Sequence, residues 1–355
     1  MISVAIIGAG IGREHLEGYR ALPDRFRVTA LCDLDLDRAA EVVGGDDSIA
    51  VTANLAEVLA DKAIDVIDIC LPPHLHFPVT LQALAAGKHV ICEKPIVRAL
   101  TEADQVETAA KAAGRHVFPV FQYRYGRAMA QLRALQEAGL AGKAFAASLE
   151  THWRRDADYY AIPWRGTWAG ESGGALLGHA IHAHDLMCYV LGPVAEVTAL
   201  TGTRVNDIET EDTAALAFRM ESGALVTSSV TLGAADDTTR LRFCFEGFTA
   251  ESGRNPYKPA SDLWTFSARG GVTQAQIDAV AKAVPEGHAS FAGYLDAVAD
   301  ALGGKPGTEV TLEDGRRSIE LVTAAYASAR LGASMALPLR PDSELYDGWL
   351  PDLPG

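Results

Sequence analysis

A glycine-rich segment near the start of the chain stands where a short apolar run meets a predicted helix. Gly8, Gly10 and Gly12 occupy alternate positions. Because glycine has no Cβ atom, such a loop lets backbone amides approach a pyrophosphate at the positive end of the helix. The usual spacing is G-x-G-x-x-G, whereas the third glycine here comes one residue early. We predict a phosphate-binding loop that includes Ile11, in which Arg13 either meets a phosphate or points to solvent.

An acidic residue follows the second apolar run at the distance expected for ribose binding. Asp33 stands about 25 residues after Gly8, close to the spacing of carboxylates that hold the ribose 2′-hydroxyl. A 2′-phosphate would be repelled, the more so with Asp35 nearby, so we expect NAD rather than NADP. Arg13 and Arg38 are cations that could reverse this choice. The alternative is a glycine turn that binds no nucleotide.

Further polar segments follow the third and fourth apolar runs. Leu71 and Pro72 lead to His76, and Glu93-Lys94-Pro95 stands directly after the run that ends at Cys92. Ligands of open parallel sheets lie beyond the carboxyl ends of the strands, so these segments are expected at the same edge as the glycine loop. The predicted cofactor site therefore contains Gly8, Gly10, Ile11, Gly12, Asp33, Leu71, Pro72, His76, Glu93 and Lys94.

The elements that must position these residues alternate between strand and helix in the first third of the chain, as parallel strands covered on both faces do. Helical spacing is found over Phe77–Ala86 and Thr101–Ala113, the second opened by Thr101 and closed by Gly114. The predicted strands are Ser3–Ile7, Val28–Cys32, Asp65–Leu71, His89–Cys92 and His116–Phe121. We therefore predict an α/β fold that begins with a doubly wound parallel (Rossmann) sheet, a dinucleotide-binding domain over residues 1–121.

The pattern changes after residue 121. A turn at Glu221–Gly223 joins two predicted strands in a hairpin, which favours a largely antiparallel sheet. Strands are predicted at Lys143–Thr151, Val194–Thr201, Thr213–Met220, Ala224–Val230, Arg240–Glu246 and Phe248–Glu251, and helices at Arg127–Ala138, His288–Leu302 and Leu312–Leu331. We predict a C-terminal α+β domain with an open, largely antiparallel sheet over residues 122–355, for substrate binding and oligomerisation.

Composition excludes several classes of function. The net charge of −15 at pH 7 repels a phosphate backbone, so nucleic acid is not expected as a partner. No stretch approaches the apolar run of about 20 residues that crosses a bilayer, so no membrane span is expected. The five cysteines contain no CxxC pair, and the N-terminus resembles a strand rather than a signal peptide. We expect a cytoplasmic protein with reduced thiols.

A short segment of the second domain is crowded with aromatic and arginine side chains. Flat apolar faces beside hydrogen-bonding forks suit polyhydroxylated rings, whose C–H faces pack on aromatics while their hydroxyls bond to polar groups. The alternative is that the aromatics mainly pack the loop against the sheet or a subunit partner. The residues concerned are Trp153, Arg154, Arg155, Tyr159, Tyr160, Trp164, Arg165 and Trp168.

Taken together, these motifs resemble the Gfo/Idh/MocA oxidoreductases. The resemblance rests on the glycine loop, Asp33, Pro72, His76 and the fairly specific Glu93-Lys94-Pro95, and it covers nearly the whole chain. It continues with Gly173-Gly174 before a helix that carries His182 and Asp185, and with a closing helix that contains Ala324-Ala325-Tyr326.

The resemblance implies roles for two residues. Lys94 would lie beside the nicotinamide and the substrate, and His182 would contact the hydroxyl being oxidised, so that the two side chains converge over the redox ring. The chemistry is consistent, because hydride loss from a secondary alcohol needs a base for its proton and a cation against the developing alkoxide. The family also implies sugars, inositols or their derivatives as substrates, and a homodimer or homotetramer.

One position departs from the family pattern. Family sequences commonly carry D-x-x-x-H on this helix, but Gly178 occupies the aspartate position. His179 and Asp185 can share a helix face with His182 and could orient it. A zinc site from His179, His182, His184 and Asp185 is not expected, because His184 should point elsewhere. The resemblance also implies that Gln122, Tyr123 and Arg124, which follow the last parallel strand, line the nicotinamide and substrate cleft, with Gln122 among the cofactor-binding residues. The candidate substrate-binding residues are Tyr123, Arg124, Trp153, Tyr160, Trp164, Arg165, His179 and Asp185.

The sequence therefore favours an NAD-dependent dehydrogenase that acts on a CH–OH group of a sugar-like or inositol-like polyol, with Lys94 and His182 as catalytic residues. Two alternatives stay open. One is a family member that holds NAD tightly and uses transient oxidation to cleave or epimerise a sugar. The other is a non-catalytic sensor of dinucleotide and sugar, which the glycine at position 178 leaves open.

Overall fold

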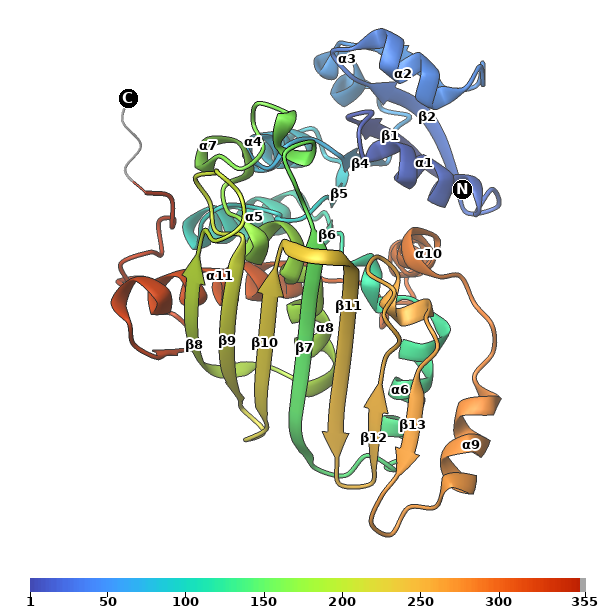
Figure 1. Cartoon of the computed structure of the whole chain (residues 1–355). Helices are drawn as coiled ribbons and strands as arrows, with labels where there is room; N and C mark the ends of the chain where they lie inside the picture. The colour runs from blue at the N-terminus through green and yellow to red at the C-terminus, as the bar shows by residue number, and fades with distance from the viewer. Residues whose placement is uncertain (352–355) are drawn as a thin grey trace. The chain divides into compact units, whose positions relative to one another are not determined.

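The computed structural model describes residues 1–351, and the chain forms two compact units (Figure 1). The first contains residues 1–121 and 291–319, and the second contains residues 122–290 and the chain from residue 320 onward. The first unit thus includes a late segment, residues 291–319, whose return the sequence pattern did not predict.

The first unit is built on a six-stranded sheet in the order β3-β2-β1-β4-β5-β6. All five strand pairs are parallel. This is the strand order of a dinucleotide-binding doubly wound sheet, in which the carboxyl ends of the strands meet at one edge. The prediction of a Rossmann sheet is confirmed. The strands are β1 (Ile2–Ile7), β2 (Phe26–Cys32), β3 (Ala50–Thr52), β4 (Val66–Ile69), β5 (His89–Cys92) and β6 (Val117–Pro119).

The helices of this unit begin and end where local chemistry favours it. Asp35 caps α2 by accepting the amide of Arg38, and Gly114 ends α5 with a left-handed φ of 62°, as predicted. Thr101 does not open α5, because the helix starts one residue earlier, at Leu100. The helices are α1 (Gly12–Arg20), α2 (Leu36–Val43), α3 (Leu55–Ala60), α4 (Pro73–Ala85), α5 (Leu100–Ala113) and α10 (Ser290–Leu302).

Helix α10 is tied to the sheet by buried and half-buried polar contacts. The Tyr294 hydroxyl is fully buried and donates to the Phe118 carbonyl, 2.9 Å away. Arg25 spans two carboxylates, those of Asp296 and Asp300, at 2.6 Å each. These contacts explain why residues so distant in sequence share the first unit.

The second unit is built on an eight-stranded sheet in the order β13-β12-β11-β7-β10-β9-β8-β14. The β10–β7 pair is parallel and the other pairs are antiparallel. The sheet is therefore mixed, with the antiparallel pairing predominant as predicted. The strands are β7 (Ala144–Arg154), β8 (Val194–Gly202), β9 (Thr213–Met220), β10 (Leu225–Thr231), β11 (Gly233–Phe245), β12 (Phe248–Glu251), β13 (Thr265–Ala268) and β14 (Met335–Ala336).

Alternating burial along the central strands shows that one sheet face is covered. Exposed and buried residues alternate through most of β9 and β10, as expected for a sheet with one solvated face. The predicted hairpin at Glu221–Gly223 is present, and Gly223 supplies the positive φ that its turn requires. The helices are α6 (Arg127–Glu137), α7 (Trp168–Glu171), α8 (Ile181–Leu191) and α9 (Gln274–Ala283), and α11 (Leu312–Leu331) runs from the first unit into the second.

Within residues 1–351, no helix is both long and apolar enough to span a membrane.

The Tyr294 hydrogen bond should contribute measurably to stability. Replacing Tyr294 by Phe leaves the buried Phe118 carbonyl without this donor, which costs about 1–2 kcal/mol. Differential scanning calorimetry should show a first unfolding transition lowered by roughly 2–4 °C. The control variant Tyr257→Phe removes a hydroxyl from a side chain that is 47% exposed and should change the transition less. An equal shift in both variants would contradict this account.

Candidate active site

The glycines of the loop have two roles: two of them allow close packing, and one leaves open space. A Cβ atom at Gly8, whose φ is +106°, would lie 2.4 Å from the Cys70 carbonyl oxygen. A Cβ at Gly12 would lie 2.9 Å from the Ile6 side chain. By contrast, a Cβ at Gly10 would meet nothing within 4 Å. The outer two glycines therefore let β1 and α1 pack against β4, and the middle glycine leaves the open face that a pyrophosphate needs.

Arg13, which stands where the third glycine is usual, pairs with a carboxylate of the neighbouring helix. Its guanidinium lies 2.8 Å from Glu41 on α2, and both side chains are exposed. Ile11 precedes α1 and is also exposed. In this structure the Arg13 side chain thus lies at the solvent-exposed surface, in an ion pair with Glu41.

The predicted ribose acid is anchored at the carboxyl end of β2. Asp33 accepts the amides of Ala9 and Asp35 at 2.7 and 2.8 Å, and Arg38 donates to both of its carboxylate oxygens at 2.7 and 2.9 Å. Burial alone would raise the pKa of Asp33, but these donors outweigh it and hold the pKa below its ordinary value. The carboxylate is therefore ionised at neutral pH, as a ribose hydroxyl acceptor must be.

The turns after β4 and β5 are joined by a buried imidazole. The ring nitrogens of His76 lie 2.6 Å from the Pro95 carbonyl oxygen and 2.7 Å from that of Leu71. Burial lowers the pKa of His76. Pro72 precedes the first turn of α4 in an extended conformation. The ring therefore holds the two predicted cofactor-binding turns together.

Lys94 is half-buried at the end of β5. Its backbone amide donates to a carboxylate oxygen of Glu93, 3.1 Å away. The other oxygen of Glu93 lies 3.1 Å from His15 Nε2 on α1. His15 was not among the predicted site residues, although its place on the helix that follows the glycine loop could have drawn attention to it.

In the second unit, a buried carboxylate holds the start of the histidine-bearing helix. Glu211 accepts the amides of Gly174 and Leu176 at 3.1 and 3.0 Å, and the Tyr326 hydroxyl at 3.0 Å. A Cβ at Gly174 would lie 1.8 Å from the Glu211 carbonyl oxygen, so only glycine fits there. Burial raises the pKa of Glu211 to about 7, against the opposing effect of these donors. Sequence reasoning singled out Gly173-Gly174 and Tyr326 but missed their acidic partner.

The helix itself begins with a π-helical turn, Leu176–Ala180, before α8. Such turns are rare and frequent at functional sites. Gly178 lies within it, and a Cβ at this position would meet nothing within 4 Å. The space beside Gly178 is therefore not filled by another side chain.

His182 is buried on α8 and stacks on an aromatic ring. Its imidazole lies 4.3 Å from the Tyr123 ring, with an interplanar angle of 16°. One residue further, Arg124 makes a two-pronged ion pair with Asp185 at 2.8 and 2.6 Å. Gln122, Tyr123 and Arg124 form a single 3-10 turn. The structure thus brings four predicted residues together, with Arg124 and Asp185 bound to each other.

His179 faces the aromatic-rich segment. Its ring lies 5.1 Å from Trp153, edge to face, and 6.0 Å from Tyr159. Trp153 is buried and donates from its indole nitrogen to Thr239. Arg165 lies over the Tyr159 ring, 3.9 Å from its centroid, and over Trp164 at 4.9 Å.

The remaining members of this segment serve partly as packing. Tyr160 packs edge to face on Tyr159 at 5.0 Å, and burial raises its pKa. Trp164 is 37% exposed. The segment therefore combines an anchored indole with a more accessible one, as a ring-binding surface requires.

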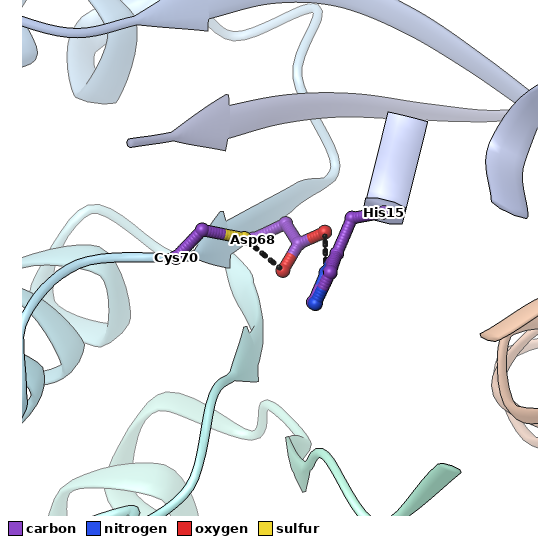
Figure 2. A group of neighbouring side chains, drawn as sticks. All are labelled: His15, Asp68 and Cys70. Atoms are coloured by element: carbon purple, nitrogen blue, oxygen red, sulfur yellow. Dashed lines mark hydrogen bonds and ion pairs between the residues drawn. The ribbon is translucent and has the colours of Figure 1, made fainter. Parts of the chain in front are cut away.

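The helix histidines have different partners. His184 pairs with Ser228 at 2.9 Å, whereas His182 stacks on Tyr123. Among residues 1–351, one group of three possible ligands converges, His15, Asp68 and Cys70 in the first unit (Figure 2).

Comparisons with known proteins agree with this architecture. Residues 2–121 match the model of an oxidoreductase family with an NAD-binding Rossmann fold, and residues 129–250 match the GFO/IDH/MocA C-terminal domain. The chain belongs to the Gfo/Idh/MocA oxidoreductase family, and its cofactor is NAD. The resemblance inferred from the sequence motifs is confirmed.

Individual relatives are dehydrogenases. Levoglucosan dehydrogenase of Pseudarthrobacter phenanthrenivorans is 30% identical over 57% of this chain and 54% of its own. Myo-inositol 2-dehydrogenase of Thermotoga maritima is 28% identical over 62% of this chain and 66% of its own. The chain spans less than two thirds of the length of several curated relatives that it matches.

A solved structure matches almost the whole chain. The WlbA dehydrogenase of Bordetella pertussis, in complex with NADH and UDP-GlcNAcA, has a TM-score of 0.83 at 27% identity. The match covers 96% of this chain and 99% of that one.

The open face at Gly10 gives a sharp test of the phosphate loop. In Gly10→Ala, the added methyl group meets no protein atom within 4 Å but would occupy the space of the pyrophosphate. Isothermal titration should show NAD affinity weakened by about tenfold or more, with the unfolding temperature unchanged within about 2 °C. The control Gly287→Ala, equally open but in the second unit, should change neither. Unchanged NAD affinity in Gly10→Ala would contradict the assignment.

The raised pKa of Glu211 predicts a pH dependence of stability. A carboxyl that binds its proton more tightly when folded contributes stability below its ordinary pKa of 4.5 and loses that contribution as the pH rises through about 7. The unfolding temperature of the wild type should therefore fall relative to that of Glu211→Gln between about pH 5 and pH 8. Thermal scans across this range test it, with the exposed Glu221→Gln as the control. A constant difference between wild type and Glu211→Gln would show that Glu211 does not titrate there.

Proposed function

We propose that the protein is an NAD-dependent dehydrogenase that transfers a hydride between a CH–OH group of a sugar-like or inositol-like polyol and nicotinamide. The observation that carries the proposal is that the chain has both an open glycine loop beside an anchored carboxylate, in its first unit, and a buried histidine on α8, in its second. Membership of the family and the dehydrogenase relatives support the reaction class. The proposed division places dinucleotide binding in residues 1–121 and substrate binding and oligomerisation in residues 122–355.

The proposed mechanism gives each residue one task. The glycine loop and Asp33 would hold NAD, which would supply the hydride acceptor. His182 accepts the hydroxyl proton, because a neutral imidazole is a base near physiological pH. The Lys94 ammonium stabilises the negative charge that develops on the substrate oxygen. In the reverse direction, His182 returns the proton as Lys94 polarises the carbonyl.

Neighbours of His182 support a fixed imidazole. Stacking on Tyr123 sets the plane of the ring. The Arg124–Asp185 pair is buried, so we propose that it holds the Tyr123 turn against α8 and acts on the substrate through this packing. Gly178 leaves room on the same helix for a substrate group or water where relatives carry an acid.

The aromatic segment supports a polyhydroxylated substrate. We propose that Trp164 and Tyr160 pack on C–H faces of the ring while Arg165 and His179 donate to hydroxyl or acidic oxygens. The relatives named for levoglucosan and inositol, and a solved relative bound to a nucleotide-linked sugar acid, fit this class. A homodimer or homotetramer in the cytoplasm is part of the proposal, with no nucleic-acid or membrane partner.

The ion pair at Asp33 supports NAD rather than NADP. The ionised carboxylate suits a ribose hydroxyl, and Arg38 already serves it as partner. A 2′-phosphate would have to displace that pairing. The alternatives, tightly held NAD used for transient oxidation and a sensor without turnover, stay open under this proposal.

Replacing Lys94 by Ala should separate chemistry from binding. Turnover should fall by about a hundredfold or more, since one oxyanion-stabilising donor is typically worth that much. Affinity for NAD, measured by titration, should change little. The exposed Lys62→Ala in the same unit is the matched control and should retain wild-type turnover. The assay first screens sugars, inositols and sugar acids with NAD and with NADP.

Each outcome of that assay separates the hypotheses. Full turnover in Lys94→Ala would refute the proposed mechanism. If NAD is held tightly by the protein and its hydride is returned to the sugar, the reaction is a transient oxidation. If NAD and polyol bind but no polyol in the panel is turned over, the protein is a sensor.

A further inference from the structure

A fully buried polar chain lies in the first unit between the glycine-loop helix and the β5 turn. His15 Nδ1 on α1 lies 2.9 Å from Asp68 Oδ2 on β4, and His15 Nε2 lies 3.1 Å from Glu93 Oε1. Figure 2 shows the His15 ring directed at the Asp68 carboxylate, with Cys70 on its other oxygen. The side chains of His15 and Asp68 have no exposed surface.

Two further side chains contact the Asp68 carboxylate. The Tyr19 hydroxyl donates to Oδ2 at 2.9 Å, and the Cys70 thiol lies 3.7 Å from Oδ1. Burial raises the pKa of Cys70 to about 12, so the thiol keeps its proton. The Asp68 carboxylate is thus held by three side chains, those of His15, Tyr19 and Cys70.

The two carboxylates determine the state of the His15 ring. An ionised carboxylate only accepts hydrogen bonds, and His15 presents one ring nitrogen to Asp68 and the other to Glu93. With a carboxylate on each side, the ring can donate from both nitrogens when it is the imidazolium. Burial opposes this charge, but the neighbouring carboxylate outweighs burial and raises the pKa of His15 well above its ordinary value. The Phe291 ring covers the imidazole at 4.6 Å, and Tyr294 lies near Tyr19.

The chain ends at the backbone of Lys94. The Glu93 carboxylate uses one oxygen for His15 and the other for the Lys94 amide. Fixing this carboxylate therefore fixes the turn from which the Lys94 side chain projects. The fixed point is α1, the helix that begins at Gly12 of the phosphate loop.

We propose that His15 is a positioning residue for Lys94, with its imidazolium held between Asp68 and Glu93 so that the Glu93 carboxylate fixes the backbone of Lys94. The inference rests on the proposed function, since it assigns to His15 the placement of the ammonium that acts on the substrate. Loss of the imidazolium should therefore lower kcat and leave the phosphate loop, which packs through its own glycines, able to bind NAD.

The first test compares His15→Gln with Lys94→Ala. Gln fills much of the same volume but carries no charge and cannot present a donor to both carboxylates. We expect kcat to fall by roughly 10- to 100-fold, since small displacements of a catalytic group cost this much, with the NAD dissociation constant within about threefold of the wild type. Wild-type kcat in His15→Gln beside an inactive Lys94→Ala would overturn the inference alone. Wild-type turnover in Lys94→Ala would instead overturn the proposed function.

A matched control distinguishes positioning from general destabilisation. Tyr19→Phe removes a donor from Asp68 on the same helix but leaves the His15–Glu93 contact in place. It should lower the unfolding temperature while kcat stays within about twofold of the wild type. An equal loss of kcat in Tyr19→Phe and His15→Gln would show that packing, not the link to Glu93, sets the rate, and would overturn the inference.

A spectroscopic test on the wild type does not depend on the variant's folding. The wild-type protein is labelled with ¹⁵N-histidine. The His15 ring is identified by the resonances that are absent from the spectrum of His15→Gln, or by the imidazolium resonances that persist to the highest pH. At about pH 8, where an ordinary histidine is neutral, both ring nitrogens should carry a proton. A ring nitrogen without a proton would overturn the inference. So would a stoichiometric metal ion whose removal allows that nitrogen to bind a proton.

Discussion

The dinucleotide site depends on how closely the backbone of the glycine loop approaches β4. Any side chain at Gly8 would collide with the Cys70 carbonyl, and any at Gly12 with Ile6. Removing these Cβ atoms brings β1, α1 and β4 together and leaves Gly10 open toward the carboxyl edge of the sheet, where Asp33 and Lys94 also lie. Because the parallel sheet places all its strand ends at this edge, one packing constraint positions both the phosphate loop and the lysine turn.

Buried carboxylates extend this design through both units. Asp33, Glu93 and Glu211 each accept backbone amides, and each holds a loop or a helix start that carries a proposed site residue. Their protonation differs because their surroundings differ: donors including Arg38 lower the pKa of Asp33, whereas burial dominates at Glu211 and raises it. The same kind of contact therefore accompanies a lowered pKa at the proposed ribose-binding carboxylate and a raised pKa at the carboxyl beneath the histidine helix.

Much of the fold could be predicted from the sequence, because its signals are local. Apolar runs, the glycine loop and the hairpin at Glu221–Gly223 gave the parallel sheet and the predominantly antiparallel pairing. Contacts distant in sequence could not be predicted: the return of residues 291–319, the His15–Glu93 contact and the Arg124–Asp185 pair depend on tertiary packing. The π-helical turn around Gly178 also has no local sequence signature. A prediction that assumes regular α-helical spacing therefore misplaces His179 relative to His182. The convergence of Lys94 and His182 stays a prediction.

The transfer of hydride itself is tested most directly by following the hydrogen. A polyol that supports turnover is labelled with deuterium at one CH–OH carbon at a time, and the NADH formed is recovered for mass spectrometry. The account predicts that label at a single carbon, and at no other, appears at C4 of the nicotinamide. The account would be contradicted if NADH forms but carries no deuterium, whichever carbon of the polyol is labelled.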